Sequence, residues 1–225
     1  GGKDSLIVLE DADMERATSS ASFGAFMHQG QICMSVEKVL VQEKVYEEFM
    51  KGFIARASKL KTGNTADKAN VIGPLINERQ AERVKHQLDD AVAKGAKIVL
   101  GGGVNGRFVE PTIVIDVTSN MDIWRDETFG PVAVVTTFKT DTEAIAMNND
   151  TEYGLIGYAY TEDFKRGQRL IEKLQTGMMG LNAGVISNAS APFGGVKMSG
   201  LGREGGFEGI NEYLSTKYTM TPNPF

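Results

Sequence analysis

The chain has 225 residues, of which 41% are hydrophobic and 24% are charged, and this composition is typical of a globular protein. The formal net charge is −5 and no basic block is present, so nucleic acid and anionic membrane surfaces are not expected as partners. No apolar run approaches the roughly 18 residues that span a bilayer. A single cysteine cannot form an internal disulfide and the first residues lack signal-peptide features, so we expect a cytoplasmic protein.

Short apolar runs alternate with amphipathic segments along most of the chain, and this pattern predicts alternating strands and helices. In chain order, strands are expected at residues 5–10, 38–42, 97–100, 109–115, 132–138, 156–160 and 178–181. Helices are expected at residues 13–21, 46–60, 77–92, 141–148 and 163–174. Their predicted N-caps share a short side chain that accepts a backbone hydrogen bond: Asp13, Asn77, Asp141 and Asp163.

The patterns within these segments indicate how they pack. The helix at 46–60 carries apolar residues at the spacing of one helical face, which predicts packing on a sheet. The run at 132–138 is almost continuously apolar, as in strands that are buried on both faces. Pro111 interrupts the segment at 109–115 and implies an edge or a bend. We therefore expect an α/β fold with a mostly parallel sheet flanked by helices.

The last stretch of the chain differs from the rest. After Gly205 and Gly206, residues 207–225 form a tail in which apolar and polar side chains alternate, and no further helix is expected. This pattern predicts a terminal strand. Such a strand could pair with the sheet of a partner chain or within its own chain, and the sequence alone favours neither.

Cys33 is the only cysteine, and small or polar residues precede it. A cysteine thiolate is a strong nucleophile near neutral pH, whereas a buried thiol can also be an inert small hydrophobe. A hydrolase would need a histidine base beside it. His28 lies on the same local segment and His86 lies on the outer part of a predicted helix. Either Cys33 is inert, or its base lies outside these residues.

Two other candidate motifs are weak. Residues 200–205 match the glycine pattern of a dinucleotide-binding loop, but they neither follow a strand nor open a helix, and no second strand–helix unit comes after them. We therefore reject nucleotide binding by this loop. Neither His28 nor His86 has a second ligand at metal spacing, so no metal is expected.

Two loops combine an aromatic residue with glycine and proline. Residues 127–131 begin with Glu127 and contain Phe129, and this combination could hold a polyol beside a flat ring, or could be a plain turn. In residues 192–195, Phe193 could wall an apolar pocket or only pin the loop.

Taken together and in this order, these segments resemble the C-terminal catalytic half of the aldehyde dehydrogenase superfamily. The matching motifs span the whole chain and lie at residues 1–3, 29–33, 72–75, 127–131, 149–155 and 192–200. Each motif alone is weak, but the ordered set is specific.

The resemblance implies a set of roles. Cys33 would attack an aldehyde to give a thiohemiacetal, with the oxyanion held by its own backbone N–H and a side-chain amide. Hydride would pass to NAD or NADP, and water would hydrolyse the thioester. Glu127 would bind the nicotinamide-side ribose and Phe129 would contact the nicotinamide. Phe193 would line the aldehyde tunnel, and Glu204 matches a position linked to proton transfer.

The resemblance implies that the substrate is a small-molecule aldehyde, in a pocket that should include Met27, Ser187 and Phe193. Residues 184–188 and 200–205 resemble succinate-semialdehyde dehydrogenases, which hold the substrate carboxylate with an arginine. Met27 occupies the matching position, and its apolar surroundings resemble benzaldehyde- and salicylaldehyde-type enzymes instead. Loss of the arginine removes a contact worth roughly 1.5–3 kcal/mol. We favour an aromatic or uncharged aldehyde.

Asn182 and Arg203 match positions that look structural, and no chemistry is assigned to them.

The family's general base is the glutamate of a Glu-Leu-Gly-Gly-Lys motif, and this chain starts at its Gly-Gly-Lys. The resemblance therefore implies that the base, the oxyanion-hole asparagine and the NAD(P)-binding domain lie outside the chain. We expect residues 1–206 to be the catalytic domain and 207–225 a strand for assembly into a dimer or tetramer. The isolated chain should not oxidise aldehydes. A cofactor-free thiol esterase or acyl-transfer domain, and a non-catalytic thiol sensor, are the alternatives.

Overall fold

The central element of the computed structural model, which describes residues 1–184 and 186–223, is a seven-stranded sheet. In sheet order its strands are β10 (Met178–Leu181), β9 (Ile156–Tyr160), β1 (Asp4–Val8), β2 (Val36–Gln42), β7 (Val132–Phe138), β6 (Thr112–Ile115) and β3 (Lys97–Leu100). Neighbouring strands pair in parallel except for β3, which is antiparallel to β6. The expected α/β fold with a mostly parallel sheet is confirmed.

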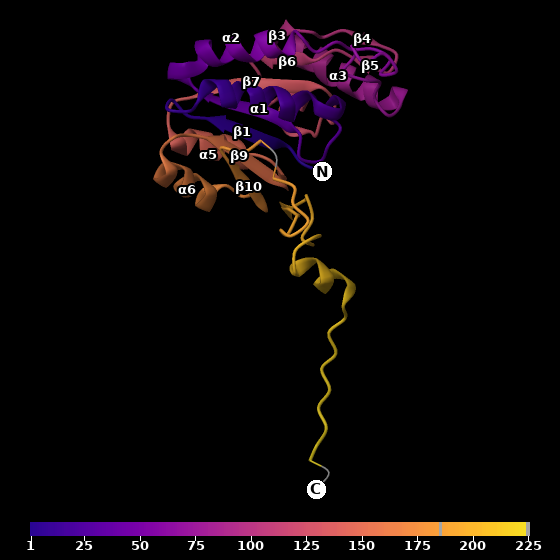
Figure 1. Ribbon diagram of the computed structural model, residues 1–225, viewed down its shortest axis with the longest axis vertical. Coiled ribbons are helices and arrows are strands. Elements are labelled where there is room, and N and C mark those ends of the chain that lie inside the picture. The colour runs from indigo at the N-terminus through magenta and orange to yellow at the C-terminus, as the bar shows by residue number, and fades with distance from the viewer. Residues whose placement is uncertain (185, 224–225) are drawn as a thin grey trace.

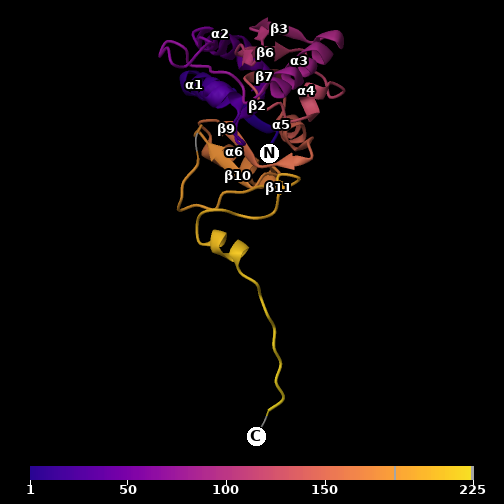
Figure 2. The same ribbon diagram turned by 90° about the vertical axis from the view of Figure 1, so that its right-hand side faces the viewer.

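Helices cover both faces of this sheet (Figures 1 and 2). One face carries α1 (Met14–Phe26) and α2 (Tyr46–Ala57), and the other carries α3 (Glu78–Ala93), α4 (Asp122–Arg125), α5 (Asp141–Asn149) and α6 (Phe164–Lys173). Side chains of a strand alternate between the faces, so Leu6 packs with α1 and α2 while Ile7 packs with the helices opposite. Both residues are fully buried.

The helix starts follow their N-caps closely. Asp13, Asn77 and Asp163 accept hydrogen bonds from the backbone N–H three residues further on, as predicted. Asp141 does not cap its helix, contrary to the prediction. Thr140 is in an extended conformation and caps α5 through its hydroxyl, and Asp141 is the first helical residue.

Several short elements complete the body of the molecule. They are η1 (Met27–Gly30), η2 (Glu43–Val45), the antiparallel pair β4 (Val104–Asn105) and β5 (Phe108–Val109), and the antiparallel pair β8 (Tyr153–Gly154) and β11 (Val196–Lys197). Pro111 separates β5 from β6, so the predicted segment at 109–115 is two strands in different sheets. The bend implied by Pro111 is therefore present.

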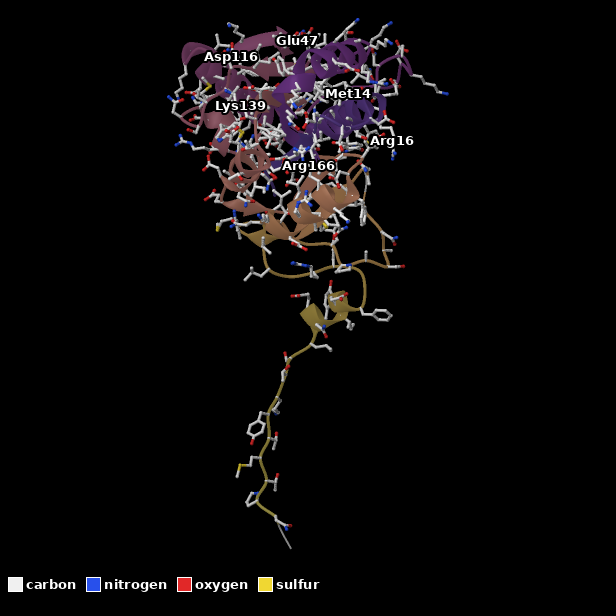
Figure 3. The ribbon with its side chains drawn as sticks, turned by 90° about the vertical axis from the view of Figure 1, so that its left-hand side faces the viewer. Met14, Arg16, Glu47, Asp116, Lys139 and Arg166 are labelled. Atoms are coloured by element: carbon white, nitrogen blue, oxygen red, sulfur yellow. The ribbon has the colours of Figure 1, made fainter. Side chains whose placement is uncertain are left out.

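Arg166 of α6, labelled in Figure 3, links two elements at the carboxyl ends of the parallel strands. Its guanidinium donates to the Asp141 carboxylate of α5 at 3.0 Å and to the Gln42 side chain at the end of β2 at 3.3 Å. This charge pair lies at the carboxyl ends of the parallel strands, whereas the loop that holds Cys33 precedes β2 and lies at their amino ends.

The C-terminal tail leaves the body of the molecule (Figure 1). It begins with a 3-10 helix, η3 (Glu208–Tyr213), where a strand was predicted to start. Two contacts explain the turn: the Gly209 N–H donates to the Gly205 carbonyl, and the Glu212 carboxylate accepts from the Arg203 N–H. Residues 214–223 extend beyond it and belong to no strand of this single chain.

No helix in the described part of the chain is both long enough and apolar enough to cross a membrane.

Candidate active site

Cys33 lies at the amino edge of the parallel strands, in the loop between η1 and β2. The other candidate loops precede strands in the same way. Residues 1–3 lead into β1 and residues 127–131 lead into β7. Because these strands run parallel, their amino ends meet at one edge of the sheet. The topology therefore gathers loops that are far apart in the sequence.

A cavity of about 440 Å³ opens beside Cys33. Among its lining residues are Ser187, Phe193 and Glu204, which were singled out from the sequence, together with Ile32 and neighbouring backbone. Ser187 and Glu204 are exposed, whereas Cys33 and Phe193 are half-buried. The structure thus brings these predicted residues into one place.

A short backbone bridge holds Phe193 and Glu204 together. The Phe193 N–H donates to the Glu204 carbonyl at 2.7 Å, and the Glu204 N–H donates to the Phe193 carbonyl at 2.8 Å. Residues that exchange both hydrogen bonds lie directly opposite each other. This bridge places a phenyl ring and a carboxylate on adjoining parts of the cavity wall.

Hydrogen bonds from β9 and within its own turn hold the Cys33 loop in place. The Tyr158 hydroxyl donates to the Met34 carbonyl at 3.0 Å. Ser35 closes the turn around the thiol, because its N–H donates to the Ile32 carbonyl at 2.9 Å and its hydroxyl accepts from the Ile32 N–H at 3.3 Å. The nucleophile candidate therefore lies on a rigid turn that is anchored to the sheet.

The surroundings of Cys33 favour the neutral thiol. Burial raises the pKa of the Cys33 thiol, and the nearby carboxylates of Asp4 and Glu204 raise it further. Burial also raises the pKa of Asp4 well above its usual range; one of its oxygens accepts from the Ile156 N–H at 3.2 Å, and the other has no partner among the described residues. A thiolate in this loop would therefore need an added base or positive charge.

The loop at 127–131 touches the Cys33 loop. Gly30 has a φ of 66°, and a Cβ there would overlap the carbonyl oxygen of Gly130. Gln31 links the same loop to the 72–75 motif, because its side chain accepts from the Ile76 N–H at 3.1 Å. Motifs at 29–33, 72–75 and 127–131 therefore converge.

Glu127 and Phe129 lie on this adjoining loop, and neither lines the Cys33 cavity. Glu127 is half-buried and accepts from the Gly2 N–H at 2.9 Å. Phe129 is half-buried and has a left-handed backbone, with φ of 51°. A carboxylate can accept from ribose hydroxyls and a phenyl face can stack on a flat ring, so this pair fits the ribose–nicotinamide end of NAD or NADP.

Met27 is not brought to the Cys33 cavity. It lines a different cavity of about 640 Å³, which α1 and α2 form with residues 71–72, and shares it with Phe23 and Phe26. The separation has a backbone cause. His28 and Gln29 have left-handed φ values of 51° and 59°, and they turn the chain between Met27 and Cys33. The role of Met27 in a substrate pocket stays a prediction.

Buried charges that the motifs did not identify surround this edge. Glu37 and Lys38 both lie in β2 and are almost fully buried. Burial and the nearby Lys3 ammonium lower the pKa of Lys38 to about 7, and its Nζ lies 4.2 Å from the centroid of Trp124. The available signal was a pair of charged residues inside an apolar run, because charges are rarely buried without a partner.

Asn182 and Arg203 have structural contacts. The Asn182 amide bonds both the N–H and the carbonyl of Thr161. Arg203 donates to the carbonyls of Gly195, Leu201 and Gly202. These contacts agree with the structural roles expected of both residues.

Residues 200–205 do not form a dinucleotide-binding loop. Only the two-residue antiparallel strand β11 precedes them and only the 3-10 helix η3 follows.

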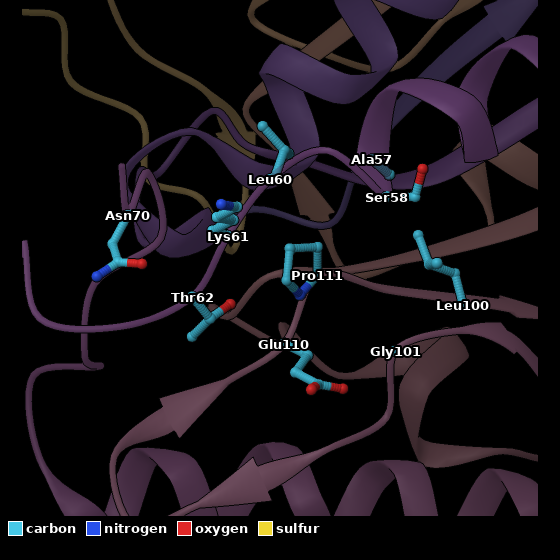
Figure 4. Close-up of a pocket in the computed structure, with 10 residues that line it drawn as sticks. All are labelled: Ala57, Ser58, Leu60, Lys61, Thr62, Asn70, Leu100, Gly101, Glu110 and Pro111. Atoms are coloured by element: carbon cyan, nitrogen blue, oxygen red, sulfur yellow. The ribbon is translucent and has the colours of Figure 1, made fainter. Parts of the chain in front are cut away.

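A further cavity of about 450 Å³, at the end of α2, is distinct from the Cys33 cavity (Figure 4). Lys61, Thr62, Glu110 and Pro111 are among its lining residues, and none of the predicted site residues is.

Comparison with known proteins identifies the family. The profile of the aldehyde dehydrogenase family matches residues 1–219. A succinate semialdehyde dehydrogenase of Acinetobacter baylyi is 45% identical, over 98% of this chain and 46% of the relative. A glutarate-semialdehyde dehydrogenase of Pseudomonas putida is 44% identical, over 97% of this chain and 46% of the relative.

Solved structures agree. An E. coli NADP-dependent enzyme has a TM-score of 0.94 and 43% identity, over 97% of this chain and 46% of that chain. A betaine aldehyde dehydrogenase of Staphylococcus aureus in complex with NAD+ has a TM-score of 0.92 and 37% identity, over 100% of this chain and 47% of that chain. The chain spans about half the length of the curated relatives it matches. From the motifs, the fold and these matches, we conclude that the chain belongs to the aldehyde dehydrogenase family.

Proposed function

We propose that this chain is the catalytic part of an NAD(P)-dependent aldehyde dehydrogenase that uses Cys33 as its nucleophile. The observation that carries the proposal is the convergence of Cys33, Ser187, Phe193 and Glu204 on one cavity, beside the loop of Glu127 and Phe129.

The proposed chemistry starts at the sulfur. The Cys33 thiol loses its proton and the sulfur bonds to the aldehyde carbon, while the carbonyl π electrons move to the oxygen. The backbone N–H of Cys33 donates to that oxyanion. Glu204 on the cavity wall takes up a released proton. Loss of a hydride from the thiohemiacetal carbon leaves a thioester, and water then cleaves its carbon–sulfur bond and frees the carboxylic acid and the thiol.

Glu127 and Phe129 are proposed to hold the nicotinamide end of the cofactor. A cofactor bound there would supply the acceptor for the hydride that leaves the thiohemiacetal carbon. Names of relatives support both cofactors: the E. coli structure is of an NADP-dependent enzyme, and the S. aureus structure contains NAD+. The match covers 46% of the relative. We propose that the part of the full-length protein equivalent to the unmatched region supplies three things: the base for water, the side-chain amide of the oxyanion hole and the remaining cofactor contacts.

An aromatic or uncharged aldehyde is the first substrate proposal. The described residues that line the Cys33 cavity include no lysine or arginine, so none of them would pair with a substrate carboxylate. A dicarboxylic semialdehyde is the second candidate, because relatives at 44–45% identity are named succinate and glutarate semialdehyde dehydrogenases. Steady-state kcat/KM for benzaldehyde and succinate semialdehyde on the full-length protein separates the two.

The decisive test of the activity uses the full-length protein with NAD or NADP. Cys33→Ser should abolish reduced-cofactor formation, and Ser190→Ala, at an exposed position of the loop between β10 and β11, should not. Turnover by the serine variant at the wild-type rate would contradict the proposal. The isolated chain is expected to show no such turnover.

A cofactor-free thiol esterase remains the alternative reaction for the isolated chain, because Cys33 and its cavity lie within it. An acyl burst with an activated ester that disappears in Cys33→Ser would support this alternative.

Residues 1–206 are proposed to act as the catalytic domain, and residues 207–225 to join copies of the chain into a dimer or tetramer. The single cysteine, without a disulfide partner, supports a cytoplasmic location.

A further inference from the structure

The geometry points to Glu37, with Lys3 as its counter-ion, as the positioning residue for the proposed nicotinamide-contacting loop. This inference rests on the proposed function, in which Phe129 contacts the nicotinamide. Glu37 does not line the Cys33 cavity and is not assigned a role by the family motifs. It acts through the backbone of residues 128 and 129.

The Glu37 carboxylate grips this loop directly. One oxygen accepts from the Phe129 N–H at 2.8 Å and from the Thr128 N–H at 2.9 Å, and the other oxygen approaches the Thr128 N–H at 2.8 Å. The side chain is 5% exposed. Hydrogen bonds to an ionised acceptor are stronger than neutral ones and set the direction of their donors. The carboxylate therefore fixes two consecutive peptide planes.

Lys3 completes this arrangement. Its side chain is fully buried, and its Nζ lies 2.6 Å from Glu37 and 3.2 Å from the Thr128 hydroxyl. We name these contacts of Lys3, Glu37, Thr128 and Phe129 the Glu37 clasp. A buried ion pair generally stabilises a fold no better than well-packed apolar residues. Its contacts here are concentrated on one loop, so loop position is the property they determine.

The loop needs such a constraint. Phe129 has φ of 51°, a region that L-residues with side chains avoid, and the conformation persists only when the surroundings enforce it. Glu37 binds the N–H of this residue. Gly130 follows it and abuts Gly30 of the Cys33 loop. A displacement of Phe129 would therefore change the spacing between the proposed cofactor contact and the nucleophile loop.

The test uses the full-length protein and amide hydrogen exchange at residues 128–129, which does not depend on turnover. The double variant Lys3→Met/Glu37→Met removes both charges and leaves apolar side chains of similar size, so the fold is expected to persist. Exchange at 128–129 should accelerate about 10- to 100-fold, as the loss of charge-assisted hydrogen bonds implies. The KM for NAD or NADP should rise about tenfold, and the KM for the aldehyde should not.

Arg166→Met/Asp141→Leu is the control, because it removes a partly exposed charge pair at the opposite, carboxyl end of the parallel strands. It should change neither readout. Glu37→Gln is the second variant, which keeps the volume but turns one acceptor into a donor toward Lys3. It should also accelerate exchange at 128–129. Unchanged exchange at 128–129 in either folded variant would overturn the inference. A wild-type protein with no cofactor-dependent activity would refute the proposed function instead, and the exchange result would still report on the Glu37 clasp.

Discussion

Buried charges are concentrated at the start of β2, and each has a different neighbour. Successive side chains of a strand face opposite sides, so Glu37 and Lys38 cannot neutralise each other directly. Glu37 pairs with Lys3. Lys38 instead lies against Trp124, and donates to the carbonyl of Asp150 at 3.4 Å. The Trp124 indole in turn donates to the Asp150 carboxylate at 3.3 Å.

Lys38 should make stability depend on pH. Burial, with the nearby Lys3, lowers the pKa of Lys38 to about 7, while an unfolded lysine titrates near 10.4. Between these values the unfolded chain binds more protons, so stability rises with pH across that window. The unfolding free energy of the wild type minus that of Lys38→Met should therefore increase by up to about 1.4 kcal/mol per pH unit above pH 7.

Urea denaturation from pH 6 to 9.5 measures that difference. Lys51→Met is the control, because Lys51 is exposed on α2 and the same comparison should give a flat line. A pH-independent gap between wild type and Lys38→Met would contradict the prediction.

Cys33 should respond to the carboxylates around it. Burial raises the pKa of its thiol first, and Asp4 and Glu204 raise it further. Removing a negative charge favours the thiolate, so Glu204→Gln should lower the apparent pKa and speed alkylation at neutral pH. Iodoacetamide rates against pH test this in the purified chain. Glu208→Gln, on the exposed η3, should leave the profile where it is.

Site residues could be predicted where a motif carried them. Cys33, Phe193 and Glu204 were singled out individually, and the fold brings them to one cavity. Glu37 was not singled out, because the role proposed for it depends on two backbone N–H groups that lie about 90 residues further along the chain. One sequence showed only a charge within an apolar run, and that pattern does not say which loop the charge would reach.

Elements with a strong local signal were predictable. The strand at 132–138 matches β7 in both bounds, and Asn77 caps α3 as expected. Elements that form only through tertiary contacts were not predictable from the sequence, and the strand pair β8 and β11 is the clearest case. Each strand has two residues and joins segments far apart in the chain, so neither has a periodicity to detect. The 3-10 turn at the start of the tail likewise depends on contacts with Arg203 and Gly205.

Gly30 is the residue at which the Cys33 loop packs against the 127–131 loop. Gly30→Ala would add a Cβ that overlaps the Gly130 carbonyl, in a backbone already at φ of 66°. The overlap involves backbone on both sides, so the loops must separate. We expect a loss of about 3 kcal/mol or more in unfolding free energy, measured by thermal or urea denaturation.

Gly106→Ala separates overlap from backbone strain. Gly106 has a similar φ of 55°, and a Cβ there meets nothing within 4 Å. Its substitution should show only the left-handed penalty of about 1–2 kcal/mol. Equal losses for both alanine variants would show that the contact with Gly130 is unimportant.

At the scale of the whole molecule, the parallel topology determines where chemistry can occur. Helices bury both faces of the sheet, so only its edges can present polar loops. The candidate site occupies the amino edge, and the chain returns to this edge after β10 to supply Phe193 and Glu204. The tail starts just after Gly205, which lines the Cys33 cavity. Whatever anchors the tail therefore also constrains a wall of the site.

The tail should mediate association of copies of the chain. Leu214, Tyr218 and Met220 share one parity in the extended segment, and they are 64%, 85% and 74% exposed. An extended segment that belongs to no strand of its own chain and has an apolar side can add to the sheet of a second copy. Truncation after Gly206 should therefore convert a dimer or tetramer to monomers, as measured by light scattering over a range of concentrations.

Proline substitution separates strand pairing from side-chain contact. Adjacent residues of an edge strand direct their N–H groups to opposite sides, and proline removes one N–H. Of Ser215→Pro and Thr216→Pro, the one whose N–H faces the second copy should weaken association about tenfold or more, and the other should weaken it much less. Because η3 and the body precede these positions, the melting temperature of the monomer should not change. If both variants and the truncated chain associate as strongly as the wild type, the tail does not join the copies.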